Sequence, residues 1–332
     1  MKNRWIKFVV LRVMLIVLAG YFAACIAPAS GVAASKSDVS DQLYIEVSAL
    51  SSLDYFWDHQ EGLRIAGEVL GVKTEYIGPY DYDMAAMVTA FEQAIAKKPD
   101  GILVVGFEDS LSAVVDKAVD AGIPVVTLDA DLVYSKRVCF VGTGNVNAGY
   151  EEGKKLCELI YGKGKVAIAT KPGQPNLEER CAGIQKAIDE NPGVEMVQII
   201  DTQSDAAVAA QATAAILQKY PDLAGIATVE AGGGAGVATA VEEAGKVGQI
   251  KIMTFDRGDI LDKIKSGAVS ASIVQNTQLM PYYGLQVLFG IRNGNFTISN
   301  DNERAGIVSA PVNIDTGIVI VDKDNVDLFV RK

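Results

Sequence analysis

The sequence contains few of the residues that usually perform catalysis. It has a single histidine, His59, and no Gly-x-Ser-x-Gly, His-Glu-x-x-His or Walker A pattern. A catalytic triad, a metal hydrolase and a P-loop enzyme therefore lack their defining parts. His59 lies inside a helical pattern, where we expect a partly exposed helix residue and not a base or a metal ligand. We expect no catalytic residue and no cofactor.

Cysteine is also scarce, with four residues and no Cys-x-x-Cys spacing. Cys25 lies near the N-terminus, which leaves Cys139, Cys157 and Cys181 in the rest of the chain. An odd number without paired spacing indicates neither a disulfide framework nor a zinc site. We expect each of the three to pack as a small apolar residue, and a bridge between one pair stays open.

Acidic residues are absent before Asp38, where the chain reads as a secretory signal. Basic residues come first, an apolar run follows over residues 13–24, and small residues lead to Ala34. The run is short for a membrane span, so a retained anchor is disfavoured. Cys25 ends the run in Phe-Ala-Ala-Cys, which resembles a bacterial lipobox; lipidation at Cys25 and cleavage after Ala34 both stay open. We predict a signal peptide over residues 1–34 and a periplasmic or extracellular protein, lipid-anchored if Cys25 is modified.

Positive charge is in deficit. The formal net charge is −11, and removal of the signal, which has four basic residues and no acidic ones, brings it to −15. A protein this acidic binds nucleic acid and anionic membranes poorly. No basic patch with interleaved aromatic residues occurs, so we expect no nucleic-acid partner.

Short apolar runs alternate with helical patterns along the remaining chain, whose length of roughly 300 residues suits about two domains. The runs are continuous in Val, Ile and Leu, as in parallel strands buried on both faces. Helical patterns include residues 56–70, 84–97 and 206–219, and Asp83 and Asp205 are expected to cap the last two. The alternation predicts an α/β fold of doubly wound parallel sheets. The predicted strands are 43–47, 72–76, 102–105, 125–128, 138–141, 166–169, 194–200, 225–228, 250–255 and 268–274.

A faint internal repeat relates the two halves of the chain. Pro-Asp-Gly-Ile at 99–102 and Pro-Asp-Leu-Ala-Gly-Ile at 221–226 each lead into a strand, a helix ending in Ala-Gly and a second strand. The second strands end at Asp129 and Asp256, and the offset of about 120–130 residues indicates two similar domains. Ligands bind beyond the carboxyl ends of parallel strands, so both carboxylates should enter a cleft between two lobes. We predict two similar lobes, 35–143 plus 276–313 and 144–275 plus 314–332, joined by a three-strand hinge near 143–144, 275–276 and 313–314.

A glycine-rich segment at 232–236 follows a strand and opens a helix, with Asp256 about 20 residues later, as in dinucleotide sites. Val237 replaces the third glycine of that pattern. We therefore favour a close-packed turn over a nucleotide site.

Three adjacent aromatic residues, Tyr55, Phe56 and Trp57, follow the first predicted strand. Successive helix positions point about 100° apart, so the three cannot all face one core. At least one should face the cleft, although packing of all three between helices stays open.

Several segments, weak alone, occur in an order and spacing that are fairly specific together. They are Val-Ser-Ala-Leu at 47–50 with Tyr55-Phe56, Pro-Val-Val-Thr-Leu-Asp at 124–129, Asn145 with Gly149, Glu-Arg-Cys-Ala-Gly at 179–183, Thr-Phe-Asp at 254–256 and Ala-Ser-Ile-Val-Gln at 271–275. From Leu43 to about Asn313 the chain thus resembles the ribose-binding-protein-like family of periplasmic sugar receptors. That family also includes sugar-responsive repressors, but this chain has a signal segment in place of their DNA-binding head, which favours transport.

The resemblance implies a monosaccharide or related polyol as ligand. It implies aromatic walls from Tyr55 and Phe56, and hydrogen bonds to sugar hydroxyls from charged and amide side chains. The residues with the hydrogen-bonding role are Asp129, Arg180, Asp256 and Gln275, and Trp57 and Glu230 complete our candidate set. Ribose itself is in doubt, because Ala130, Glu230 and Ser204 stand where ribose binders carry Arg, Asn and an aromatic residue.

The mechanism implied is hinge closure of a monomer, with the closed form recognised by the permease and ATPase subunits of an ABC importer. Two alternatives stay open. One is a secreted carbohydrate-processing enzyme that uses Asp129, Glu230 and Asp256 as acid–base carboxylates. The other is a sugar receptor for a chemotaxis or sensor protein.

Overall fold

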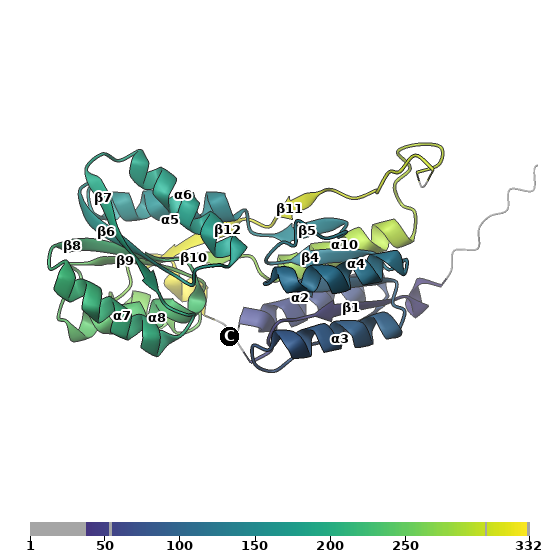
Figure 1. The fold of residues 1–332 in the computed structure, drawn as a ribbon, viewed down its shortest axis with the longest axis horizontal. Helices are drawn as coiled ribbons and strands as arrows, with labels where there is room; N and C mark the ends of the chain where they lie inside the picture. The colour runs from purple at the N-terminus through teal and green to yellow at the C-terminus, as the bar shows by residue number, and fades with distance from the viewer. Residues whose placement is uncertain (1–37, 53–54, 303, 331–332) are drawn as a thin grey trace, which may run out of the picture. The chain divides into compact units, whose positions relative to one another are not determined.

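The computed structural model describes residues 38–52, 55–302 and 304–330. Two six-stranded sheets organise this part of the chain, and helices cover both faces of each sheet (Figure 1). The predicted signal at 1–34, with Cys25, lies outside the described residues, so its cleavage and lipidation stay predictions. None of the helices in the described ranges is long and apolar enough to cross a membrane.

The first sheet is entirely parallel, in the order β11-β5-β4-β3-β1-β2. Its strands are β1 (Leu43–Val47), β2 (Lys73–Ile77), β3 (Gly101–Val105), β4 (Val125–Leu128), β5 (Cys139–Gly142) and β11 (Asn313–Asp315). Helices α2 (Tyr55–Leu70) and α10 (Leu279–Arg292) pack on one face, and α3 (Met84–Ala96) and α4 (Ser112–Asp120) pack on the other. We call this sheet and its helices the first lobe.

The second sheet has the order β12-β10-β9-β8-β6-β7, in which only β12 is antiparallel to its neighbour. Its strands are β6 (Gly164–Thr170), β7 (Val194–Asp201), β8 (Leu223–Thr228), β9 (Lys251–Phe255), β10 (Ala271–Gln275) and β12 (Ile318–Asp322). Helices α5 (Asn145–Leu159) and α6 (Pro175–Asp189) cover one face; α7 (Ala206–Lys219), α8 (Ala231–Glu243) and α9 (Ile260–Ser266) cover the other (Figure 1). This sheet and its helices form the second lobe, and the predicted α/β fold of two similar lobes is confirmed.

The chain passes between the two sheets at three places, residues 143–144, 276–278 and 316–317. Hydrogen bonds tie the three crossings together: the Thr316 N–H donates to the Gly142 carbonyl at 2.8 Å, and Asn276 Nδ2 donates to the Thr316 carbonyl at 2.8 Å. The third crossing falls a few residues after the predicted 313–314, because Asn313–Asp315 still pairs with β5 as β11. The lobe boundaries given above stay a prediction.

Glycines allow the helices of the second lobe to pack closely. A Cβ on Gly149 of α5 would lie 2.0 Å from the Arg180 carbonyl of α6, and a Cβ on Gly236 of α8 would lie 2.0 Å from the Ala206 carbonyl of α7. The glycine-rich segment at 232–236 therefore serves helix packing inside α8, as the sequence favoured. Close approach of α6 to α5 also fixes where the Arg180 side chain starts.

The predicted helix caps are confirmed: Asp83 accepts from the Ala86 N–H, and Asp205 accepts from the N–H groups of Ala207 and Val208. The three described cysteines are free, with Cys139 and Cys157 buried and Cys181 partly buried. The open alternative of a bridge between one pair is therefore not realised. Burial raises the pKa of the Cys139 and Cys181 thiols to about 11, which suits packing and not reactivity.

Candidate functional site

Asp129 and Asp256 end corresponding strands of the two lobes, β4 and β9. Both have a left-handed backbone with φ of 66°, and both are buried, at 2% and 7% exposure. Each N–H donates to the next strand of its sheet, from Asp129 to the Val141 carbonyl at 3.2 Å and from Asp256 to the Ile273 carbonyl at 2.7 Å. The left-handed turn ends each strand and aims the carboxylate beyond the sheet edge, where ligands of parallel sheets bind.

Tyr55, at the start of α2, is bonded to the carboxylate of Asp129. Its hydroxyl donates to Asp129 Oδ1 at 2.9 Å. Burial raises the pKa of Tyr55 well above its ordinary value, the charges of Asp129 and Asp256 raise it further, and Arg180 opposes them. Tyr55 therefore stays protonated and can donate a hydrogen bond, and the charges of Asp129, Asp256 and Arg180 act on it.

Arg180 lies on α6 and is 2% exposed. Its guanidinium donates to Asn145 Oδ1 at 2.9 Å, to the Val229 carbonyl at 2.8 Å and to Gln275 Oε1 at 2.7 Å. The same group stacks 4.2 Å from the centre of the Phe255 ring. Protein partners therefore fix the orientation of Arg180 before any ligand contacts it.

Gln275, at the end of β10, links the hinge to the second-lobe carboxylate. Its Oε1 also accepts from Thr143 Oγ1 at 2.8 Å, and its Nε2 donates to Asp256 Oδ1 at 3.0 Å. Burial raises the pKa of Asp256 to about 6; Arg180 and the bond from Gln275 lower it, and Asp129 and Glu230 raise it. Asp256 therefore changes charge close to neutral pH.

A cavity of about 630 Å³ is lined by residues of both lobes, among them Tyr55, Asp256 and Gln275. Its volume lies within the usual range for small-molecule sites, about 300–1,000 Å³. Asp129 and Arg180 do not line it directly, but each bonds to a lining residue, Tyr55 and Gln275 respectively. The structure thus brings together five of the eight candidate residues: Tyr55, Asp129, Arg180, Asp256 and Gln275.

The other three candidates lie elsewhere. Phe56 is buried in the first-lobe core and makes an edge contact with the Phe107 ring. Trp57 is 51% exposed and does not line the cavity. Glu230 caps α8, where its carboxylate accepts from the N–H groups of Gly232 and Gly233 at 2.6 and 2.8 Å and from a buried threonine hydroxyl. These contacts occupy the helix N-terminus that an anionic nucleotide would need.

His59 is fully buried, so the prediction of a partly exposed residue is wrong. Its Nδ1 lies 2.7 Å from Oε1 of Glu46, which is equally buried in β1. Burial lowers the pKa of His59, but attraction and hydrogen bonding from Glu46 more than offset this, and the pKa is raised. The helical pattern does not reveal this pairing, because Glu46 lies in a strand that reads as purely apolar around it.

Asp58, Arg257 and Thr277 also line the cavity and were not among the candidates. Asp58 forms an ion pair with Arg257 and accepts from Thr277 Oγ1 at 2.9 Å. Sequence spacing could have suggested Asp58 and Arg257 as lining residues, since Asp58 is three residues after Tyr55 on the same helix face and Arg257 directly follows Asp256.

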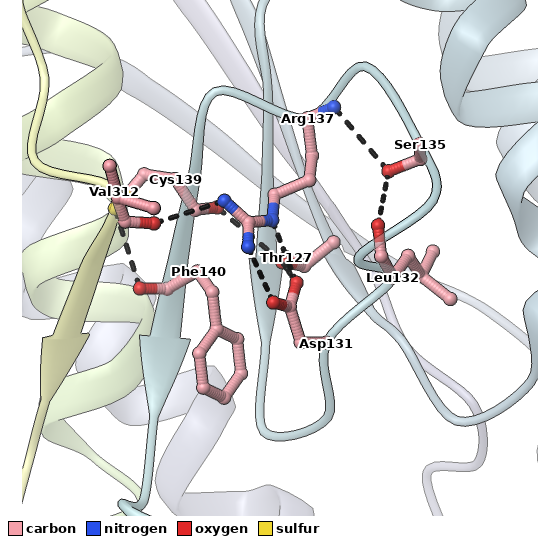
Figure 2. Close-up of polar contacts among 8 residues, drawn as sticks. All are labelled: Thr127, Asp131, Leu132, Ser135, Arg137, Cys139, Phe140 and Val312. Carbon is pink, nitrogen blue, oxygen red and sulfur yellow. Dashed lines mark hydrogen bonds and ion pairs between the residues drawn. The ribbon is translucent and has the colours of Figure 1, made fainter. Parts of the chain in front are cut away.

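The loop after Asp129 is fixed by an ion pair between Asp131 and Arg137 (Figure 2). Arg137 Nε donates to Asp131 Oδ1 at 2.7 Å, and Nη1 donates to the Val312 carbonyl at 3.0 Å. Thr127 Oγ1 of β4 also donates to Asp131 Oδ1, at 2.9 Å. The network connects the segment carrying Asp129 to the residue that precedes β11 and the third crossing.

Within the described ranges no group of three or more His, Cys, Asp or Glu residues is arranged to hold a metal ion. The assembled side chains instead offer hydrogen-bond acceptors on two carboxylates and donors on Tyr55, Arg180 and Gln275. A polyhydroxylated ligand has hydroxyl groups that both donate and accept, so it matches this mixed set.

Comparison with known proteins gives consistent matches. The family described as "Periplasmic binding protein domain" matches residues 45–295. AraP, an arabinose binding protein from Geobacillus stearothermophilus, is 37% identical, with a TM-score of 0.80, over 88% of this chain and 100% of that chain. The sugar-binding protein of a sugar ABC transporter from Bacillus halodurans is 36% identical, with a TM-score of 0.83, over 87% of this chain and 100% of that one. The D-ribose/D-allose-binding protein of Pseudomonas aeruginosa is 26% identical over 243 residues, 70% of this chain and 75% of the relative.

Proposed function

This chain belongs to the periplasmic binding protein domain family, and we propose that it is the receptor of an ABC importer for a neutral monosaccharide, with arabinose as the first candidate. It is an extracytoplasmic sugar-binding protein and not an enzyme, so the carbohydrate-processing alternative is not retained. Arabinose comes first because AraP, at 37% identity, is named for that sugar. A receptor that serves a chemotaxis or sensor protein stays an alternative.

The observation that carries the proposal is a pair of hydrogen-bonded sets at the facing sheet edges, Tyr55 with Asp129 in the first lobe and Arg180 with Gln275 and Asp256 in the second. Each side chain is held by protein contacts, so little conformational entropy remains to be lost on binding. We propose that Asp129 and Asp256 accept from sugar hydroxyls, that Arg180 and Gln275 donate to them, and that the Tyr55 ring packs on the sugar. We assign Phe56 to the first-lobe core and Glu230 to the cap of α8.

Ligand contacts from both lobes exist together only when the lobes are closed. A sugar that contacts both therefore shifts the population toward closure. We propose that the closed form is what the permease and ATPase subunits of the importer recognise. The net charge of the chain after removal of the predicted signal does not favour attachment to an anionic membrane, so residence at the membrane would come from lipidation of Cys25.

The experiment that tests the proposal is a thermal-shift screen of the mature protein against arabinose, ribose, xylose, allose, glucose, galactose and xylitol. A ligand present at about 100 times its Kd stabilises the native state by about 2.7 kcal/mol, which is a shift of a few degrees in Tm. We expect the largest shift with a pentose. No shift with any of these compounds would overturn the proposal.

Two variants localise the site. Asp256→Ala and Gln275→Ala should abolish the shift, because each removes a contact at the cavity. Glu243→Ala, at the end of α8 and remote from the cavity lining, is the matched control and should retain the shift. Incubation of the bound sugar followed by recovery of the same sugar checks that binding is not accompanied by turnover.

A further inference from the structure

Asp58 and Arg257 form an ion pair that joins the two lobes at the cavity, and both residues line it. Asp58 belongs to α2 of the first lobe, and its side chain is 5% exposed. Arg257 follows β9 of the second lobe, directly after Asp256, and its side chain is 28% exposed. Any opening that separates α2 from the segment after β9 must break this pair.

The Asp58 side of the pair is held firmly. Thr277, in the second crossing, donates to the same Asp58 oxygen at 2.9 Å. One turn later on α2, a Cβ on Gly62 would lie 2.1 Å from the Gln278 carbonyl, so this face of α2 lies directly against the second crossing. Asp58 is therefore a fixed anchor, and Arg257 is the partner that an opening motion would carry away.

The ion pair also offsets electrostatic repulsion between the two lobes. The facing sheet edges carry the carboxylates of Asp129 and Asp256; burial raises the pKa of Asp256, and the charge of Asp129 raises it further. Closure brings like charges together, which opposes it. An attractive contact that forms only on closure, and lies next to Asp256 in the chain, offsets this repulsion.

We propose that Asp58 is a positioning residue, which acts through Arg257 to hold the segment carrying Asp256 against the first lobe and to favour the closed form before a ligand binds. The proposal rests on the sugar-binding function. Apparent affinity equals intrinsic affinity multiplied by the fraction of protein in the competent form. A larger closed fraction in the free protein therefore means tighter sugar binding without any contact between Asp58 and the sugar.

The test compares Asp58→Asn, Arg257→Gln and the double variant with wild type. Asp58→Asn keeps an acceptor for Thr277 and so preserves the local fold. We expect each single variant to bind the sugar about three- to tenfold more weakly, as is typical when one partner of a partly exposed charge pair is removed. The double variant should bind no more weakly than either single one, because the same interaction is lost in all three.

Two readouts separate positioning from general destabilisation. X-ray scattering of the ligand-free proteins should give a larger radius of gyration for the variants than for wild type, and Arg257→Lys, which keeps the charge, should restore part of the affinity. The matched control is Asp222→Asn, which breaks the 2.9 Å pair with Lys165 inside the second lobe and should change neither radius nor affinity. An unchanged radius or an unchanged affinity in Asp58→Asn, or additive losses in the double variant, would overturn the proposal.

The experiments separate a failure of the ion-pair proposal from a failure of the proposed sugar-binding function. If wild type binds none of the screened sugars, the function is wrong, yet scattering of the ligand-free proteins still decides whether the pair favours closure. If wild type binds sugar but all radii are equal, the function holds and the role of Asp58 fails.

Discussion

Asp129 and Asp256 adopt the same left-handed backbone conformation, with φ of 66°, at the ends of corresponding strands. Asp and Asn tolerate this region better than other residues with a Cβ, and glycine adopts it without a steric cost. The aspartates thus combine a backbone requirement with a carboxylate at the sheet edge. Substitutions can separate the two requirements.

We predict that Asp129→Gly and Asp129→Ala both abolish sugar binding, because both lack the carboxylate. The free energy of unfolding of Asp129→Ala should be about 1 kcal/mol lower than that of Asp129→Gly, since only alanine is strained at positive φ. The same pair of substitutions at Asp256 should behave alike. Urea unfolding and calorimetric titration measure the two effects, and equal stability of the Ala and Gly variants would show that the left-handed turn carries no strain.

Sugar affinity should depend on pH through Asp256, whose pKa is raised to about 6 by burial. Hydroxyl donors from a sugar favour the ionised carboxylate, so the complex holds this proton less tightly than the free protein. Affinity should therefore be constant above pH 7 and fall as pH drops through about 6. Calorimetric titration between pH 5 and 8 measures this, and in Asp256→Asn the fall near pH 6 should vanish.

The same group has the opposite effect on folding. Because its folded pKa is above the unfolded value, Asp256 contributes stability that is fully present below about pH 4 and lost as pH rises through about 6. The free energy of unfolding of wild type relative to Asp256→Asn should decrease over that window. A relative stability that rises with pH would contradict burial as the cause of the raised pKa.

Most of the fold could be predicted because the parallel strands are buried on both faces. The runs at 43–47 and 125–128 are apolar apart from Glu46 and Thr127, and they form β1 and β4 with the predicted bounds. By contrast, β11 and β12 were not predicted. β11 has only three residues at a sheet edge, too few to give a strand pattern. β12 was overlooked although its first four residues, Ile-Val-Ile-Val, are as apolar as those of the buried strands.

The site could be predicted where it repeats between the lobes. The repeat located Asp129 and Asp256, whereas the role of Phe56 as an aromatic wall was implied by the family resemblance, and its side chain is buried in the first-lobe core. Glu230 looked like a ligand residue because it follows β8, yet its carboxylate reaches back to its own helix N-terminus. Pairings such as Asp58 with Arg257 join residues 199 positions apart, so no local pattern reports them.

Arg137 should stabilise the loop after Asp129 through its paired bonds to Asp131 and its bond to the Val312 carbonyl (Figure 2). The Asp131 and Arg137 side chains are only 19% and 13% exposed, so the pair is poorly screened by solvent. We predict that Arg137→Lys lowers the free energy of unfolding by about 1–2 kcal/mol, because lysine cannot reproduce the planar, bidentate geometry. Sugar affinity should fall as well, since Asp131 is two residues from Asp129.

Arg64→Lys is the matched control for this substitution. Arg64 also pairs with two carboxylates, Glu61 and Glu68, but on the exposed face of α2. Surface pairs contribute little, so its change in stability should be much smaller than that of Arg137→Lys. Urea unfolding of both variants measures the difference. Equal losses in the free energy of unfolding would mean that burial of the Arg137 pair does not strengthen its contribution to stability.

The buried pair of Glu46 and His59 should stabilise the first lobe in a pH-dependent way. Neither side chain contacts solvent, and Glu46 is the main cause of the raised pKa of His59. We predict that Glu46→Gln lowers the free energy of unfolding by about 3 kcal/mol near pH 6, because a buried partner loses its counter-charge. A group whose pKa is raised in the folded protein contributes its full stabilisation at pH values below its pKa in the unfolded chain, about 6.5 for histidine. This stabilisation is lost as pH rises through the pKa in the folded protein.

The difference between wild type and Glu46→Gln should therefore shrink toward alkaline pH, as measured by urea unfolding between pH 5.5 and 9.5. His59→Gln in the Glu46→Gln background serves as the control, since with both charges gone the remaining pH dependence from this pair should vanish. Because Glu46 and His59 do not line the cavity, sugar affinity at pH 7.5 should change little in either variant. A difference that stays constant across this pH range would mean that the pair acts as a neutral hydrogen bond and that His59 carries no charge in the folded protein.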